Sequence, residues 1–70
     1  MTTTYRVPDI SCQHCVNAIT SEVEQIPGVQ RVAVDLGTKQ VQVDANEQVT
    51  KDTVIAAINE AGYDDVTVLN

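Results

Sequence analysis

The sequence contains little basic charge, and this scarcity excludes two classes of partner. Four lysine and arginine residues stand against ten aspartate and glutamate residues, which gives a net charge of −6 in a chain of 70 residues. Nucleic-acid-binding proteins need clustered lysine and arginine to neutralise phosphates, and anionic membrane surfaces attract the same clusters. The stretch Pro8 to Gln30 has no lysine or arginine at all. We therefore expect neither nucleic acid nor a membrane surface as a partner.

Aromatic residues are nearly absent, since the chain has no tryptophan, no phenylalanine and only two tyrosines. The hydrophobic core must therefore come from valine, isoleucine, alanine and leucine. A chain of 70 residues buries only a limited core, so we expect residues 1–70 to form one small domain with little room for a catalytic cleft. No Ser–His–Asp set, paired general acid and base, or phosphate-binding glycine loop is visible. We predict that the protein is not an enzyme.

Long hydrophobic segments are missing as well. The longest purely apolar run, 54–58, is far shorter than the roughly 20 residues that a membrane-spanning helix needs. The N-terminal residues lack the basic region and apolar stretch of a secretory signal peptide. We therefore expect no insertion into a membrane and a cytoplasmic location. Cysteines in that compartment normally stay reduced, which favours metal binding or redox activity over a structural disulfide.

Hydrophobic periodicity predicts an α+β fold. Apolar residues alternate with polar ones in some segments and recur every three or four residues in others. These patterns predict strands at 3–7, 31–36, 40–45 and 66–69 and helices at 16–26 and 53–61. Thr50 is the expected N-cap of the second helix, Gly62 its stop, and 37–39 the hairpin turn. The order β-α-β-β-α-β is that of the ferredoxin-like sandwich, a four-stranded antiparallel sheet with two helices on one face.

Cys12 and Cys15 are the only cysteines of the chain, and they lie where the first predicted strand gives way to a helix. Residues three apart lie on the same side of a helical turn, so both sulfurs can converge on one ion. The partial positive charge of a helix N-terminus favours their thiolate forms. Two thiolates select a soft ion such as Cu(I), whereas Zn(II) needs four ligands and the chain has no second Cys-X-X-Cys motif.

A second interpretation of the cysteine pair is thiol–disulfide exchange, because thioredoxin also uses a Cys-X-X-Cys motif. Proteins of that kind are usually longer and carry a tryptophan before the motif and a proline within it. This chain has neither. An incidental pair of cysteines is a third interpretation, but the spacing and the position at a helix start argue against it.

His14, the only histidine, lies between the two cysteines. Its place on the helical turn does not face the same way as both sulfurs, so we expect an exposed side chain that modulates the local charge. The alternative role is a third ligand to an ion that two molecules share.

Three motifs of the chain carry a family resemblance. They are Ser11-Cys12-Gln13-His14-Cys15-Val16, Ile26-Pro27-Gly28-Val29 and Glu60-Ala61-Gly62-Tyr63. Together they resemble the heavy-metal-associated domain family over residues 3–69, most closely its small bacterial copper chaperones. The resemblance implies that Cys12 and Cys15 bind Cu(I) and that Tyr63 lies near the site. Two roles are open for the Tyr63 side chain. Its ring or hydroxyl shields the sulfurs, or the side chain packs against the end of the sheet.

The chain departs from the family pattern before the first cysteine. The family usually has a methionine two residues before it, which packs in the interior and does not bind the metal, and here this residue is Ile10. Isoleucine keeps the apolar volume, so we expect metal binding to survive. Relatives that handle Zn(II) often place aspartate directly before the first cysteine. Ser11 at that position favours Cu(I).

The resemblance implies a soluble copper chaperone that delivers Cu(I) by ligand exchange to the metal-binding domain of a copper-transporting P-type ATPase. A metal-linked homodimer is a further possibility. The start at Met1 and the end soon after the last predicted strand favour a free-standing protein. The alternatives are a regulatory metal-binding module of such an ATPase and a thiol–disulfide redox protein. The acidic, lysine-free stretch 8–30 predicts a partner face rich in lysine or arginine.

Overall fold

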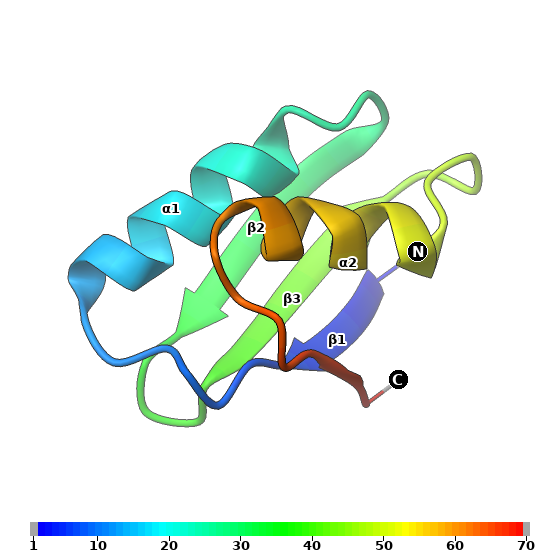
Figure 1. Ribbon diagram of the computed structural model, residues 1–70. Coiled ribbons are helices and arrows are strands. Elements are labelled where there is room, and N and C mark those ends of the chain that lie inside the picture. Colours follow the sequence, from blue (N-terminus) through cyan, green and yellow to red (C-terminus); the bar gives the residue numbers. More distant parts are fainter. Residues whose placement is uncertain (1, 70) are drawn as a thin grey trace.

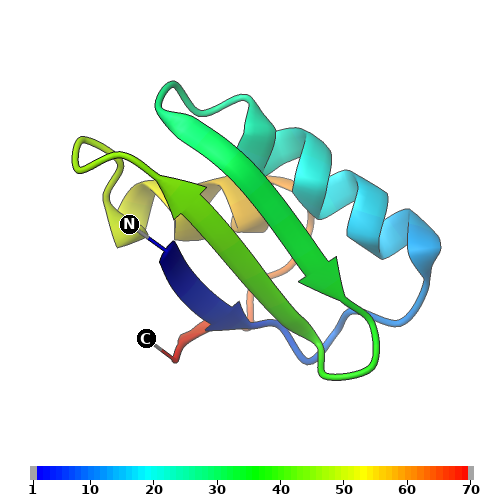
Figure 2. The ribbon, with the colours of Figure 1, turned by 180° about the vertical axis from the view of Figure 1, so that it is seen from behind.

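The fold is a sheet that is covered on one face by two helices (Figure 1). The computed structural model describes residues 2–69. Its elements are β1 (Thr2–Arg6), α1 (Gln13–Glu24), β2 (Val29–Asp35), β3 (Gln40–Ala45), α2 (Lys51–Glu60) and β4 (Thr67–Val68). Seen from behind, the strands lie in front of both helices (Figure 2). The predicted β-α-β-β-α-β order and the ferredoxin-like α+β fold are confirmed.

The four strands follow the order β2-β3-β1-β4, and all neighbouring strands are antiparallel. The central strand β1 pairs with β3 along its whole length, from Thr2 opposite Asp44 to Arg6 opposite Gln40. The edge strand β4 contributes only two residues. The cysteine loop therefore leaves the sheet from the end of a well-paired central strand.

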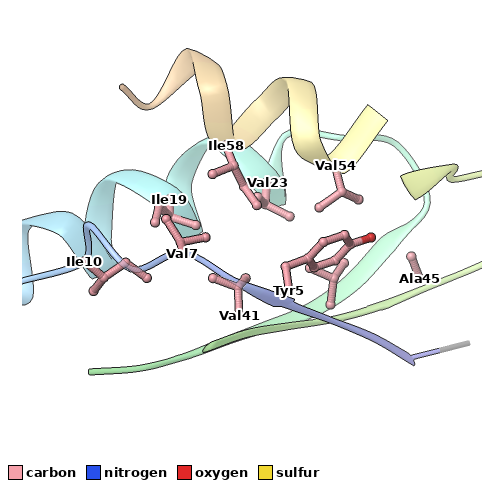
Figure 3. Close-up of a cluster of buried hydrophobic side chains, with 10 residues drawn as sticks. Tyr5, Val7, Ile10, Ile19, Val23, Val41, Ala45, Val54 and Ile58 are labelled. Carbon is pink, nitrogen blue, oxygen red and sulfur yellow. The ribbon is translucent and has the colours of Figure 1, made fainter. Parts of the chain in front are cut away.

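The hydrophobic core fills the space between the helices and the sheet (Figure 3). Its buried members are Tyr5, Val7, Ile10, Ile19, Val23, Val41, Val43, Ala45, Val54 and Ile58. As the composition predicted, these residues are almost all aliphatic, and Tyr5 is the one aromatic member. No polar or charged residue within 2–69 is buried. Any charge needed for function must therefore lie at the surface.

Both helices begin and end earlier than the hydrophobic pattern predicted, with α1 ending at Glu24 and α2 at Glu60. α1 starts at Gln13 and α2 at Lys51, because Cys12 and Thr50 are N-caps with extended backbones. The polar residues of each first turn lie outside the apolar stripe, so periodicity could not reveal them. Thr50 is confirmed as a cap, since its hydroxyl accepts a hydrogen bond from the Thr53 N–H at 3.2 Å. Neither helix in residues 2–69 is long and apolar enough to cross a membrane.

The hairpin turn between β2 and β3 is confirmed at its predicted position. The Asp35 carboxylate accepts hydrogen bonds from the N–H groups of Gly37 at 2.8 Å and Thr38 at 3.3 Å. Lys39 then adopts a positive φ of 60° and returns the chain into β3. The predicted strand 31–36 began two residues too late, because β2 already starts at Val29. It also extended one residue too far at Leu36, which lies beyond β2 and is 37% exposed.

A matched pair of substitutions in α2 tests the contribution of the core. Ile58 is fully buried and Ile55 is half-buried in the same helix. Ile58→Val leaves a small cavity, so it should lower the free energy of unfolding by about 0.5–1.5 kcal/mol. Ile55→Val should have a smaller effect. Urea denaturation followed by circular dichroism measures both values, and equal losses would contradict this placement of the core.

Candidate metal centre

The two cysteines occupy the first turn of α1. Cys12 is the N-cap, with an extended backbone at φ −156° and ψ 173°, and Cys15 follows within the helix. The Cys12 carbonyl accepts hydrogen bonds from the N–H groups of Cys15 at 3.1 Å and Val16 at 3.3 Å. The Cys12 side chain forms no capping bond with residues 2–69, so its thiol is left for a ligand. Cys12 is exposed and Cys15 is half-buried.

The two sulfur atoms lie 3.5 Å apart, and both thiols are free. A metal–sulfur bond is about 2.3 Å long, so one ion can reach both atoms at this separation. Near-linear coordination would need a sulfur separation of about 4.6 Å, twice that bond length. The exposed Cys12 side chain can supply the difference by a small rotation. The spacing therefore suits one soft ion held by two thiolates.

The Cys15 thiol is the more acidic group of the site. Hydrogen bonding from the Tyr63 side chain, followed by a backbone hydrogen bond at Ser11, lowers its pKa from 9.0 to about 6. The same bond to Cys15, together with burial, raises the pKa of Tyr63 to about 12. At neutral pH, Cys15 is therefore mostly thiolate and Tyr63 is a protonated donor. The Ser11 hydroxyl lies 3.8 Å from the Cys15 sulfur and completes the polar surroundings.

Tyr63 reaches Cys15 because of the way in which α2 ends. Gly62, with a φ of +103°, turns the chain after the helix, as glycine readily does. The Tyr63 N–H then donates to the Ile58 carbonyl at 3.3 Å, and the Asn59 amide donates to the Tyr63 carbonyl at 2.7 Å. These bonds fix the tyrosine backbone between the helix end and the cysteine loop.

His14 is exposed on the first turn of α1. No group of three or more His, Cys, Asp or Glu side chains within residues 2–69 is arranged to hold a metal ion. The side chains able to bind a metal that the fold brings together in the described residues are therefore the two cysteines, with Tyr63 beside Cys15. The exposure predicted for His14 is confirmed, and its alternative role as a third ligand stays a hypothesis.

Ile10 and Lys39 complete the surroundings of the cysteine loop. Ile10 is fully buried, in keeping with the packing role expected of it. Lys39 is a residue that sequence reasoning missed, since it was predicted only as part of the turn. Its side-chain amine donates a hydrogen bond to the Ile10 carbonyl, across a sequence separation of 29 residues. No local pattern could have indicated this contact, because it arises only when the hairpin turn meets the loop.

Removal of the tyrosine hydroxyl should raise the pKa of the Cys15 thiol. In Cys12→Ser, which leaves one thiol, the rate of alkylation by iodoacetamide should rise with pH through an inflection well below 9.0, the ordinary value. Adding Tyr63→Phe removes the main cause of the low pKa, so the inflection should move up and the rate at pH 7 should fall. An inflection that does not move would show that Tyr63 does not stabilise the thiolate.

Known proteins of similar sequence cover almost the whole chain. A copper chaperone CopZ from Bacillus subtilis is 41% identical over 63 residues, which cover 87% of this chain and 90% of that protein. A COP-associated protein from Helicobacter pylori is 36% identical over 64 residues, which cover 91% of this chain and 97% of that protein. The copper-transporting ATPase RAN1 from Arabidopsis thaliana is 32% identical over 62 residues, which span 86% of this chain and only 6% of the ATPase.

The fold also superposes closely on solved structures. The yeast copper transporter domain Ccc2a superposes with a TM-score of 0.91 at 26% identity, covering 99% of this chain and 94% of that domain. A chain of the Atx1–Cu(I)–Ccc2a complex superposes with a TM-score of 0.86 at 26% identity, covering 99% of this chain and 94% of that chain. The sequence pattern of the heavy-metal-associated domain matches residues 4–64. The chain therefore belongs to the heavy-metal-associated domain family.

Proposed function

We propose that this protein is a copper chaperone, and not an enzyme, that carries one Cu(I) ion between Cys12 and Cys15. The observation that carries the proposal is the pair of free thiols 3.5 Å apart at the start of α1. The Bacillus subtilis relative, which is named a copper chaperone, supports copper as the cargo. We further propose that residues 1–70 form a single heavy-metal-associated domain that works in the cytoplasm.

The site's electrostatics suit a monovalent ion. Two thiolates and one Cu(I) ion leave a single negative charge, and the N-terminus of α1 stabilises that charge with its partial positive end. The Tyr63 hydroxyl, which is the main cause of the low pKa of Cys15, donates to the same sulfur. Zn(II) would need two further ligands, and the residues that the structure describes offer no third side chain in a ligand cluster. The site therefore favours Cu(I) over Zn(II).

Transfer would proceed by ligand exchange, with no change in the oxidation state of copper. A thiolate of the partner forms a bond to the ion, which is briefly bound by three sulfurs. The bond from the ion to one donor cysteine then breaks. A second thiolate of the partner displaces the other donor cysteine in the same way. Cys12 is the better first leaving ligand, because its side chain is exposed and Cys15 is half-buried beside Tyr63.

The partner we propose is the metal-binding domain of a copper-transporting P-type ATPase. Two relatives support this choice: the ATPase RAN1, which matches this chain over a short part of its length, and the complex of Atx1, Cu(I) and Ccc2a. Three exposed aspartates, Asp9, Asp64 and Asp65, form what we call the acidic rim. The Asp9 charge contributes to the raised pKa of Tyr63, and Asp64 and Asp65 directly follow Tyr63 in the chain. A partner face with lysine or arginine around its own cysteines would complement this rim.

A thiol–disulfide redox protein is the second candidate function. The two free thiols at 3.5 Å and the lowered pKa of Cys15 are also what an attacking thiolate requires. A regulatory module of an ATPase would use the same copper chemistry as a free chaperone. A metal-linked homodimer, with His14 or a second pair of cysteines as additional ligands, would appear as a change of mass on loading.

An anaerobic titration of the reduced protein with Cu(I) against a competing chelator tests the carrier function. We expect one ion per chain, bound far more tightly than Zn(II). Cys12→Ser and Cys15→Ser should each weaken binding by more than about 100-fold, because even residues outside the ligand set change metal affinity by 10–100-fold. His14→Ala is the matched control in the same helical turn and should bind Cu(I) as the wild type does. Binding indifferent to the cysteines would favour the redox candidate instead.

Docking to the ATPase domain should depend on salt, because exposed charges are screened within about 10 Å at 0.1 M ionic strength. Raising the salt from about 0.05 M to about 0.5 M should weaken the affinity severalfold by calorimetry. The double substitution Asp64→Asn and Asp65→Asn should reduce this dependence. The exposed Asp52 lies in the first turn of α2, so Asp52→Asn is the control and should leave it unchanged. Affinity that does not vary with salt would contradict the role of the acidic rim.

A further inference from the structure

Lys39 brings a positive charge to the cysteine loop from a distant part of the chain. Its side-chain amine donates a hydrogen bond to the backbone carbonyl of Ile10, two residues before Cys12. The stretch Pro8 to Gln30, which contains the whole loop, has no lysine or arginine of its own. The hairpin turn after β2 lies beside the loop after β1 in both ribbon views (Figures 1 and 2).

Two hydrogen bonds of Lys39 join the turn to the loop. The Val7 N–H donates to the Lys39 carbonyl at 2.9 Å, and the Lys39 side chain binds the Ile10 carbonyl. Val7 and Ile10 are both fully buried, and the Ile10 N–H also donates to the Val7 carbonyl at 3.1 Å. Lys39 therefore binds both ends of the segment 7–10, which leads directly into Ser11 and Cys12.

The backbone of Lys39 makes this contact more notable. Its φ of 60° is the only positive φ of a non-glycine residue within residues 2–69. Glycine would adopt this conformation without steric conflict, and an outlier of this kind points to a role for the side chain. A hydrogen bond from a charged donor is among the stronger kinds in proteins. The bond to Ile10 is the contact that glycine could not make.

We propose that Lys39 is a positioning residue for the copper site. By holding the Ile10 carbonyl, it keeps the segment before α1 in the conformation that presents Cys12 toward Cys15. A site with only two ligands gains affinity when its loop is ordered before the ion arrives, since less freedom is lost on binding. The inference rests on the proposed copper function and adds a residue of the β2–β3 turn to the binding site.

Three variants test the proposal. Lys39→Ala removes the ammonium, Lys39→Arg keeps a charged donor, and Lys51→Ala removes the same charge from an exposed position at the start of α2. The first readout is the carbonyl ¹³C chemical shift of Ile10 in the metal-free protein, which reports the hydrogen bond directly. The second is the Cu(I) affinity measured against a competing chelator. Lys39→Gly, which suits the positive φ, replaces Lys39→Ala if that variant does not fold.

We expect Lys39→Ala to shift the Ile10 carbonyl signal and to weaken Cu(I) binding about three- to tenfold, the loss that one hydrogen bond can account for. Lys39→Arg should restore most of the affinity, and Lys51→Ala should behave as the wild type. An unchanged affinity in Lys39→Ala, or an equal loss in Lys51→Ala, would overturn the proposal. Failure of the wild type to bind Cu(I) would instead refute the proposed function, while the carbonyl shift would still report the contact in the metal-free protein.

Discussion

The position at which α1 begins is the constraint on which the rest of the site depends. Because Cys12 is the N-cap, its backbone is extended while Cys15 is already helical, and this combination brings the two sulfurs to 3.5 Å. The core holds this start from both sides, through the buried Ile10 before it and the buried Ile19 within the helix. A helix that began one residue later would leave Cys12 outside the turn and separate the thiols.

The proposed carrier must hold its ion and also give it up, and the asymmetry of the two cysteines would meet both needs. Cys15 is half-buried and its pKa is lowered by Tyr63, so it is mostly thiolate at neutral pH, and under the proposed function it would be the ligand that leaves second. Cys12 is exposed, so a partner thiolate could approach a bound ion from that side. Tyr63, which follows α2, acts on the Cys15 sulfur, and Lys39, in the turn between β2 and β3, binds the loop that leads to Cys12.

Sequence reasoning was sufficient for the fold and for the proximity of the two cysteine sulfurs, since both follow from local patterns. Periodicity predicted every helix and strand in the observed order, with bounds that differ by up to three residues, and the Thr50 cap and the hairpin turn were correctly predicted. The start of α1 was missed because Gln13 and His14 are polar and give no hydrophobic signal. The bond from Lys39 to Ile10 and the effect of Tyr63 on Cys15 join residues far apart in the chain. Such contacts depend on how the loops meet and have no local signature.

The central claim, a copper ion held by two thiolates and nothing else, is tested most directly by X-ray absorption spectroscopy. The protein is loaded with one Cu(I) per chain in the absence of any thiol reductant, and the copper edge and its fine structure are recorded. The account predicts scattering from two sulfur atoms and no nitrogen ligand. A nitrogen ligand, which would point to His14, or a third sulfur, which would point to an ion shared between chains, would contradict it.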